Sequence, residues 1–181
     1  MRREIVEKIE IPAGIELQLS ENQISLSKGQ EKFSRRYDEF LIKKEGNILE
    51  LYCKSATKNQ KKLIKTMAAH IRNAISGFDK KFVYRLQICS VHFPMTVTFD
   101  KSKKEVMVKN FLGEVKPRLA KVLDSVDVKI EKDIIFVEGH CREKSGQTAA
   151  NIEKSTKITN RDRRTFQDGI YIIEKPGEKE K

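Results

Sequence analysis

The sequence predicts an α+β protein of two tandem, duplicated domains, each an antiparallel sheet with one packed helix. Three observations predict this fold. Short runs of alternating apolar and polar residues, separated by turn residues, indicate antiparallel strands with one buried face. Residues 58–76 carry apolar side chains at helical spacing. The stretch IKKEGNILEL (42–51) matches VKIEKDIIFV (128–137) at an offset of 86 residues, which indicates an internal duplication.

The first half of the chain begins with short strands. Turns are expected at Glu21-Asn22, Lys28-Gly29 and Glu45-Gly46-Asn47, because Gly and Asn tolerate the left-handed backbone angles that tight turns need. The alternating runs between these turns predict strands at 16–19, 24–26, 33–37 and 48–52.

A helix is expected over residues 58–76. Its apolar face consists of Leu63, Ile64, Met67, Ala68, Ile71 and Ile75. Thr57 and Gln60 have the spacing of a capping box, in which the two side chains satisfy free backbone amides at the start of a helix. Gly77 stands where a C-terminal cap belongs. The strand expected at 82–88 either completes the first sheet or begins the second domain.

The second half repeats the order of the first. Strands are expected at 96–99, 105–108, 126–130, 134–137 and 170–173, and the hairpin between the third and fourth turns at Lys132-Asp133. A shorter helix is expected to start near Gln147. An offset of 87 pairs Gln60 with Gln147 and Tyr84 with Tyr171.

The same offset predicts that the second helix packs poorly. It places Asn151 and Lys154 where the first helix has Ile64 and Met67. Two polar residues at buried positions would weaken the contact with a sheet, so we interpret this helix as released from core packing or recruited for another role.

Charge is the strongest compositional signal. The chain has 37 Lys and Arg against 26 Asp and Glu, a formal net charge of +11. An excess of this size is typical of a protein with a polyanionic partner, most often nucleic acid. The alternative is a surface of paired charges, as in thermophilic proteins, whose excess is positive by chance.

Several other classes of protein are not expected. The sequence has no apolar run long enough for a membrane span and no signal peptide, so we expect a soluble protein that is not secreted. Its cysteines, Cys53, Cys89 and Cys141, are widely spaced and are expected to be reduced thiols. His70, His92 and His140 lack the spacing of metal ligands, and no cofactor or small-molecule substrate is expected.

Basic residues concentrate near the second helix. Cations supply affinity for phosphates, and short hydroxyl and amide side chains bond phosphate and ribose oxygens. The alternative is an ordinary solvated face. The candidate RNA-binding residues here are Lys154, Lys157, Thr159, Asn160, Arg161, Arg163 and Arg164. Just upstream, Lys144, Ser145, Gly146 and Gln147 lead into the helix, where free amides attract a phosphate and glycine permits a close approach.

Three segments resemble a known family. SVHFPMTVTFDKSKKEVMVKNFLGE (90–114), REKSGQTAANIEKST (142–156) and NRDRRTFQDGIYIIEK (160–175) are similar to the archaeal and eukaryotic branch of the L-six family of large-subunit ribosomal proteins. The resemblance covers nearly the whole chain and is strongest in its second half. It implies division into a first repeat at 1–81 and a second repeat at 82–174. The tail at 175–181 is expected to be disordered from its own sequence, as chain termini commonly are.

The resemblance also implies a function. A member of this family is a structural, non-enzymatic constituent of the large ribosomal subunit in the cytoplasm. It binds large-subunit rRNA near the sarcin-ricin loop, with neighbouring ribosomal proteins at the stalk base. On this chain the rRNA contacts fall on 144–147 and on 154–164. Bacterial members have a Gly- and Lys-rich loop before the last strand, whereas this chain has TFQDG at 165–169.

Two other functions stay open at this point. The first is a free-standing RNA-binding adaptor or chaperone that joins no particle. The second is an enzyme that uses Cys141 with His140, but neighbouring residues on a strand point to opposite faces, which makes this pair a poor dyad.

Overall fold

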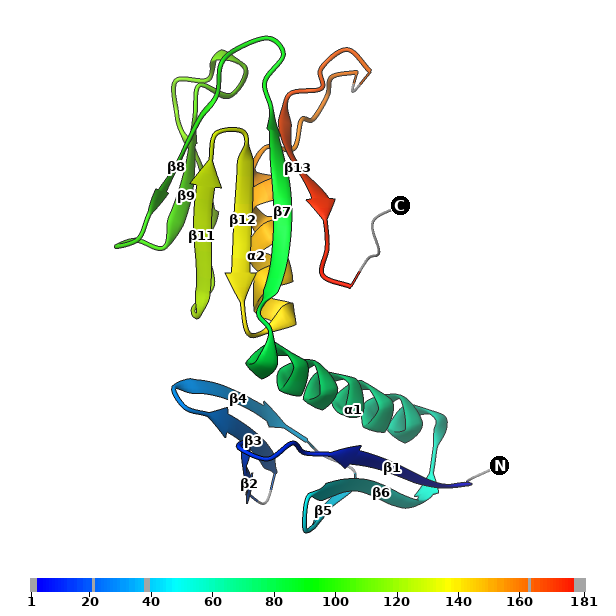
Figure 1. The fold of residues 1–181 in the computed structure, drawn as a ribbon. Coiled ribbons are helices and arrows are strands. Elements are labelled where there is room, and N and C mark those ends of the chain that lie inside the picture. Colours follow the sequence, from blue (N-terminus) through cyan, green and yellow to red (C-terminus); the bar gives the residue numbers. More distant parts are fainter. Residues whose placement is uncertain (1–2, 21, 38–39, 163, 178–181) are drawn as a thin grey trace. The chain divides into compact units, whose positions relative to one another are not determined.

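The computed structural model describes residues 3–20, 22–37, 40–162 and 164–177 (Figure 1). The chain divides into two compact units, Met1–Lys80 (unit 1) and Lys81–Lys181 (unit 2). Each unit consists of antiparallel sheets and a helix packed on them, so the predicted α+β class with duplicated sheet-plus-helix domains is confirmed. The exact boundary after residue 81 stays a prediction.

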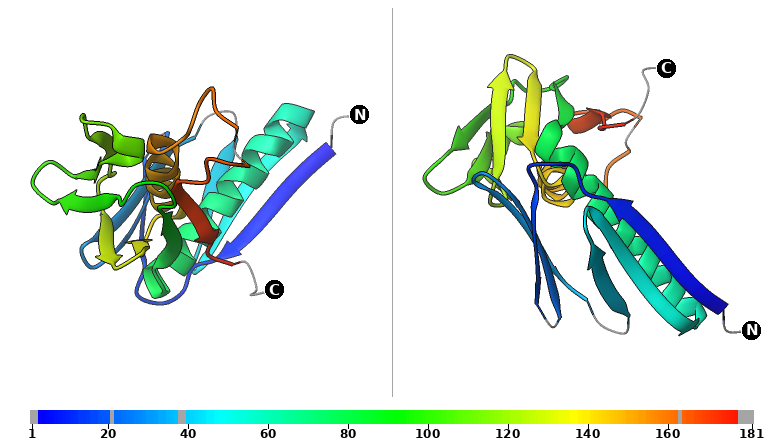
Figure 2. Two further views of the ribbon diagram at one scale, coloured as in Figure 1. Left: turned by 90° about the horizontal axis from the view of Figure 1, so that it is seen from above. Right: turned by 60° about the horizontal axis from the view of Figure 1, so that its bottom comes forward.

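Unit 1 has two sheets and one long helix. The first sheet has the order β1-β6-β5 and the second has the order β2-β3-β4. The helix α1 packs against β1 and β6, as the two views of Figure 2 show. The bounds are β1 Arg3–Glu10, β2 Glu16–Ser20, β3 Gln23–Lys28, β4 Glu31–Arg36, β5 Leu41–Glu45, β6 Ile48–Ala56 and α1 Lys58–Asp79.

Unit 2 repeats this plan and adds a final strand. Its sheets have the orders β10-β9-β8 and β11-β12-β7-β13. The helix α2 contacts β7, β12 and β13 of the second sheet and β10 of the first. The bounds are β7 Phe82–Cys89, β8 Thr96–Asp100, β9 Glu105–Lys109, the 3-10 turn η1 Phe111–Gly113, β10 Arg118–Lys121, β11 Val126–Glu131, β12 Ile134–Gly139, α2 Arg142–Ser155 and β13 Gly169–Glu174.

The helix α1 begins as predicted but ends later. Thr57 and Gln60 form the predicted capping box. The helix continues through the buried Gly77 to Asp79, so Gly77 is not its cap. The predicted apolar face is also wrong at Leu63, which is 45% exposed. The residues that pack into the core of unit 1 are Ile64, Met67, Ala68, Ile71, Ala74 and Phe78.

The two hairpins that suggested a duplication are equivalent in the structure. β5 ends at Glu45 and β6 begins at Ile48, while β11 ends at Glu131 and β12 begins at Ile134, each 86 residues later. The offset also holds for the turn, because Gly46 and Lys132 both have positive φ, at 60° and 50°. The same left-handed turn is therefore built once with glycine and once with lysine.

The strand β7, which follows α1, corresponds to a different strand of the other unit than the sequence offset suggested. β7 pairs with β12 in unit 2 just as β1 pairs with β6 in unit 1, so β7 corresponds to β1. The offset of 87, which pairs Tyr84 on β7 with Tyr171 on β13, therefore does not join equivalent strands. β13 lies beside β7 and has no counterpart in the sheets described for unit 1.

The helix α2 starts at Arg142, five residues before the expected start, and it does pack on the sheets. Its buried residues are Ser145, Thr148, Ala149 and Ile152. These have the spacing i, i+3, i+4, i+7 of Ile64, Met67, Ala68 and Ile71 in α1, which is the period of one helix face. Equivalent core residues of α1 and α2 are thus 81 residues apart in the sequence, not 87. Asn151 and Lys154 therefore do not occupy core positions.

The larger core belongs to unit 2. It contains Leu86, Val106, Val108, Phe111, Ile135, Val137, Ile152 and Ile170 among its fully buried members. Within the described residues, no helix is long and apolar enough to cross a membrane. Of the tail expected at 175–181, residues 178–181 lie outside the described residues, and the carbonyl of Pro176 accepts a hydrogen bond from Arg142.

Candidate functional site

Most of the predicted contact residues lie on one segment of unit 2, the α2–β13 loop (residues 156–168). Lys154 precedes it in the last turn of α2 and is exposed. Arg163 lies outside the described residues. The exposed candidates on the loop are Lys157, Thr159, Asn160, Arg161 and Arg164. The described candidates from the basic segment therefore lie at the end of α2 and on this one loop.

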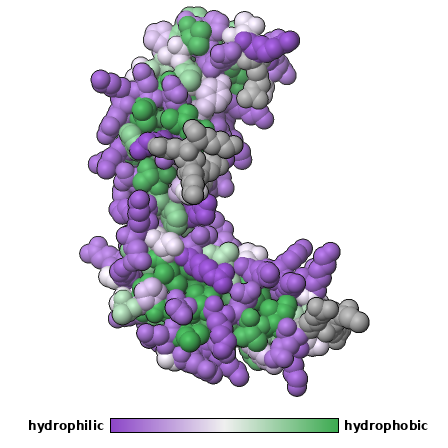
Figure 3. Space-filling view, turned by 45° about the vertical axis from the view of Figure 1, so that its right-hand side comes forward, coloured by the Kyte–Doolittle hydropathy of each residue, from purple (hydrophilic) through white to green (hydrophobic). Residues whose placement is uncertain are grey.

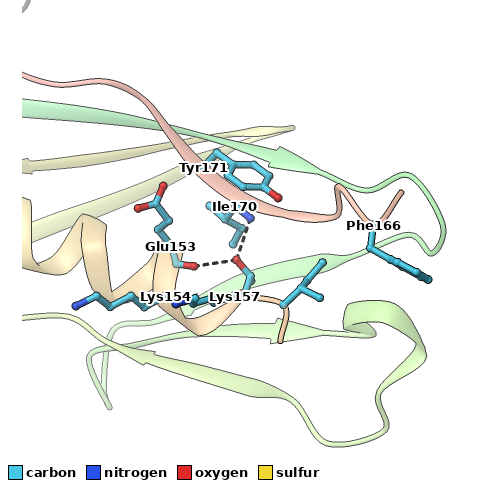
Figure 4. A pocket seen from close by; sticks show the side chains of 8 residues that line it. Glu153, Lys154, Lys157, Phe166, Ile170 and Tyr171 are labelled. Atoms are coloured by element: carbon cyan, nitrogen blue, oxygen red, sulfur yellow. Dashed lines mark hydrogen bonds between the residues drawn. The ribbon is translucent and has the colours of Figure 1, made fainter. Parts of the chain in front are cut away.

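The loop is anchored where it leaves α2. The hydroxyl of the buried Thr156 donates to the carbonyl of Glu153 and accepts from the amide of Ile170 on β13, at 3.2 and 2.9 Å (Figure 4). The Glu153 carboxylate accepts from the amide of Ile172, at 3.1 Å. These bonds join the end of the helix to the first residues of the strand, so both ends of the loop are held to the same sheet.

Arg118 on β10 makes a second anchor. Its guanidinium donates to the carbonyls of Ser155 and Lys157, at 3.0 and 3.2 Å, which satisfies acceptors at the C-terminal end of α2. It also forms two parallel bonds with the Glu114 carboxylate, at 2.8 and 2.6 Å, and lies 4.2 Å from the ring centroid of Phe111. The hydrogen bonds from Arg118 lower the pKa of Glu114, with Arg161 adding a smaller effect in the same direction.

The far end of the loop is fixed by Asp168. Its side chain is 1% exposed, and its Oδ1 accepts from the amides of Val91 and His92, at 2.7 and 2.9 Å, in the connection between β7 and β8. The ring of His92 bonds the other carboxylate oxygen. Burial by itself raises the pKa of Asp168, but the hydrogen bonds from His92 and Val91 outweigh it and hold the pKa below its usual value of 3.8.

Aromatic contacts brace the middle of the loop. Phe166 stacks on His92 with ring centroids 5.1 Å apart, and the guanidinium of Arg161 lies 4.8 Å from the centroid of Phe166. The amide of Phe166 also donates to the carbonyl of Asp162, at 2.9 Å. A cation held against a ring loses less freedom on binding a ligand than a free side chain, so Arg161 is partly preorganised.

Arg164 has a local acidic partner. Its guanidinium and its amide both bond the Asp162 carboxylate, and these bonds lower the pKa of Asp162. The side chain of Arg164 is nevertheless 91% exposed. Exposed ion pairs contribute little to stability, so Arg164 can exchange Asp162 for a phosphate at small cost.

The four predicted residues at the start of α2 divide into two pairs. Lys144 and Gln147 are exposed, and Gln147 donates to Asn151 one turn later instead of capping the helix. Ser145 is fully buried, and a Cβ on Gly139 would lie 2.5 Å from its hydroxyl oxygen. A Cβ on Gly146 would lie 2.8 Å from the hydroxyl oxygen of Tyr84.

These distances correct the prediction for Ser145, whose hydroxyl is buried, and they show that the partly buried Gly146 has a packing role. Both residues are small because α2 approaches β12 and β7 closely at this point, and neither side of the contact has room for a larger group. The buried Ser145 hydroxyl cannot reach an external ligand, and Gly146 serves helix packing. Sequence reasoning assigned them to binding because it placed the start of the helix five residues too late.

A cavity of about 240 Å³ opens beside the loop (Figure 4). Its lining combines two lysines with two aromatic rings on a partly apolar floor. The lining residues are Glu153, Lys154, Thr156, Lys157, Ile158, Phe166, Ile170 and Tyr171. The cavity therefore lies within the cluster of candidate residues and not apart from it.

Hydrophilic side chains cover much of the face shown in Figure 3, with apolar side chains exposed between them. Charged residues make up 35% of the chain. Sequence reasoning missed Arg118, His92 and Asp168, which anchor the loop. None of the three carried a local signal, because each contact joins segments that are distant in the sequence.

No arrangement for metal or thiol chemistry emerges from the part of the chain that the structure describes. Within it, no group of three His, Cys, Asp or Glu side chains could hold a metal ion. Cys141 is the N-cap residue of α2, and His140 beside it is buried. All three cysteines are free thiols.

The buried Asp168 predicts a pH dependence of stability. Because its pKa is lower in the folded chain than in the unfolded one, the contribution of the carboxylate is complete well above pH 3.8 and is lost as the pH falls through the folded-state pKa. Asp168→Asn is expected to lower the unfolding free energy of unit 2 by about 2 kcal/mol at pH 6, since hydrogen bonds to a charged group are lost. Chemical denaturation between pH 3 and pH 6 measures this difference, which should shrink towards the acid end. An unchanged difference across that range would contradict the assigned role.

The chain is similar to known proteins over nearly its whole length. The profile of the family described as ribosomal protein L6 matches residues 93–169. The chain is 41% identical to large ribosomal subunit protein uL6 of Methanococcus vannielii over 175 residues, which cover 96% of this chain and 95% of that protein. It is 38% identical to the uL6 protein of Desulfurococcus amylolyticus, over 94% of this chain and 95% of that protein. It is 40% identical to the uL6 protein of Methanosarcina mazei, over 97% of this chain and 99% of that protein.

Proposed function

Since this chain belongs to the ribosomal protein L6 family, we propose that it binds large-subunit rRNA through the α2–β13 loop and the exposed side of α2. The resemblance predicted from three segments of the sequence is confirmed, and the relatives are archaeal. The family is a structural, non-enzymatic component of the large ribosomal subunit, which is cytoplasmic.

The observation that supports rRNA binding most is the anchoring of the loop. Arg118, Thr156 and Asp168 hold it at both ends, while its cations point to solvent. A loop that is fixed before binding loses little conformational entropy when it meets a rigid partner. Folded RNA is such a partner, and it presents phosphates at spacings that a fixed set of cations can match.

The proposed mechanism is charge neutralisation on a rigid frame. Lysine and arginine side chains neutralise phosphates that would otherwise repel one another where RNA helices approach. Hydroxyl and amide groups then bond ribose or phosphate oxygens, so the shape of the RNA and not its base sequence determines where the protein binds. The residues proposed for this contact are Lys144, Gln147, Lys154, Lys157, Thr159, Asn160, Arg161, Arg163 and Arg164.

The position within the subunit is a further part of the proposal. We place the contact near the sarcin-ricin loop, with neighbouring large-subunit proteins of the stalk base as partners. The resemblance to the family supports this address. The division of the chain into repeats at 1–81 and 82–174, with the main rRNA-binding surface in the second, belongs to the same proposal and agrees with the location of the loop in unit 2.

Sedimentation of a cell extract tests the proposed function. The protein is expected to migrate with large subunits on a sucrose gradient at moderate salt and to stay with them after a high-salt wash, because many contacts dissociate together only slowly. Two controls are probed in the same fractions. A small-subunit protein marks the small subunits, and a soluble translation factor marks the light fractions. Recovery only in the light fractions at both salt concentrations would favour the adaptor or chaperone and would reject a ribosomal constituent.

A further inference from the structure

The solvent-facing side of α1 carries a row of lysines, Lys58, Lys61, Lys62 and Lys65, which we call the lysine stripe. Their spacing is i, i+3, i+4, i+7, so the four side chains share one face of the first two turns. All four are exposed. The opposite face packs on β1 and β6 through Ile64, Met67 and Ile71, so the row is directed away from the core of unit 1 (Figure 2).

The charges of the stripe are not compensated within the described part of the chain. No described carboxylate forms an ion pair with any of its four lysines, and the first turn of α1 contains no acidic residue. Other parts of unit 1 are different. Arg72, further along α1, pairs with Glu7 at 3.2 Å, and Lys8 on β1 pairs with Glu50 at 2.7 Å.

This arrangement is unfavourable for the isolated helix. Like charges three and four residues apart repel one another, and the stripe contains four such pairs. Positive charge near the N-terminus of a helix also opposes the helix dipole. In α2, by contrast, the first turn contains Glu143. A sequence that is electrostatically unfavourable in the free protein becomes favourable when an anion lies along the same face.

We propose that the lysine stripe is a second RNA-contact surface, which binds backbone phosphates of structured RNA independently of the α2–β13 loop. The stripe runs for about 10 Å along the helix axis, given a rise of 1.5 Å per residue. That length is comparable to the rise of about three nucleotides along the axis of a duplex, at about 3.4 Å per nucleotide of each strand. The inference rests on the proposed function only in taking rRNA as the polyanion.

The composition of the stripe favours RNA over an acidic protein as its occupant. Among its neighbours on the exposed face, Asn59, Thr66 and Ala69 are small or polar, and the one large apolar residue, Leu63, lies to one side of the row. Protein–protein interfaces are depleted in lysine and centre on buried aromatic or large apolar residues, and this face offers none on the line of the lysines. Lysine is instead a common phosphate ligand, which acts as a point charge.

Measurement of rRNA affinity with the full-length chain tests the inference. The Gln variant changes Lys58, Lys61, Lys62 and Lys65 to glutamine, which has a helix propensity similar to that of lysine. Its affinity for purified large-subunit rRNA at 0.1 M salt is expected to fall more than about tenfold, and the slope of log affinity against log salt is expected to become shallower by about 3. The thermal midpoint of unfolding should rise slightly, because repulsion within α1 is removed.

Two control variants distinguish the effect of the lysine stripe on rRNA affinity from the effect of total charge. An Arg variant of the same four positions keeps the charge and should keep both affinity and slope. A matched variant with the same loss of charge, Lys32, Lys44, Lys101 and Lys103 to glutamine, changes exposed lysines on other elements and should lose less than about threefold.

The outcomes distinguish this inference from the proposed function. If the Gln variant binds like the matched variant while alanine at Arg161, Arg163 and Arg164 abolishes binding, the stripe is not an RNA surface and the proposed function stands. If the unaltered chain shows no salt-dependent binding to rRNA, both are rejected. Loss of affinity in the Gln variant with retention in the Arg variant supports the stripe.

Discussion

Alanine at Arg161, Arg163 and Arg164 together is expected to lower the affinity for large-subunit rRNA about 100-fold at 0.1 M salt. Each phosphate contact contributes about 0.7 to 0.9 to the slope of log affinity against log salt, and three contacts are removed. Arg161 is braced by Phe166 and Arg164 bonds Asp162, so both side chains are already positioned on the anchored loop. Filter binding across a salt series measures both quantities.

Two control variants test whether the expected loss of affinity depends on these three arginines or only on net charge. Alanine at Lys101, Lys103 and Lys132 removes the same charge from exposed turns of unit 2 and is expected to cost less than about fivefold. Lysine at the three arginine positions keeps the charge but loses the planar fork, so partial binding is expected. Unchanged affinity of the alanine variant, with folding intact, would remove the three arginines from the interface.

Met67→Ala is expected to lower the unfolding free energy of unit 1 by about 2 to 5 kcal/mol, the usual range for a buried large-to-small change. Met67 is 5% exposed and lies in the core of unit 1 with Ile64 and Ile71. Because protein interiors are closely packed, the expected loss includes a cavity term as well as the buried apolar area.

Leu63→Ala is the matched control for Met67→Ala. Leu63 lies on the same helix but is 45% exposed, so its truncation is expected to cost less than about 1 kcal/mol. Because the two units can unfold separately, denaturant-dependent hydrogen exchange read by mass spectrometry should assign the loss to α1 and its sheet. Equal protection of the Met67→Ala protein and its parent would show that the helix face is misassigned.

Much of the fold was readable from local sequence patterns. The β11–β12 hairpin was predicted with its turn at Lys132-Asp133, and β6 was predicted with the turn before it at 45–47. β5 was not predicted as a strand, although the stretch 42–51 was matched to 128–137 at the offset of 86. The start of α1 was predicted because Thr57 and Gln60 form a complete capping box. In these cases the residues that determine the structure are within a few positions of one another.

Elements with weaker local signals were missed. β1 mixes charged and apolar residues, and Arg118–Lys121 (β10) contains only four residues, too few for a period to show. The start of α2 was placed too late because its N-cap, Cys141, makes no side-chain cap bond. Without a cap to mark the start, Gly146 was interpreted as a point where a phosphate approaches the helix N-terminus, whereas it is an internal helix residue.

Only part of the candidate site could be predicted from local sequence. A run of basic residues can be recognised without knowledge of tertiary contacts, so the segment from Lys154 to Arg164 could be identified from composition alone. Its anchors could not be identified, because Arg118, His92 and Asp168 are distant in the sequence from the backbone groups they bond. Such contacts depend on how the sheets are arranged in space.

The sequence by itself determined the α+β class, the duplication, the family and the location of the basic segment, all of which depend on local periodicity, composition and segment similarity. Tertiary structure alone decided that β7 pairs with β12 and β13, that Ser145 is buried, that Gly146 lies close to Tyr84, and that the α2–β13 loop is held at both ends. The physical reason is that burial and hydrogen bonding are properties of contacts between distant segments. A local pattern specifies which face of an element is apolar, but only the packed chain specifies what that face meets.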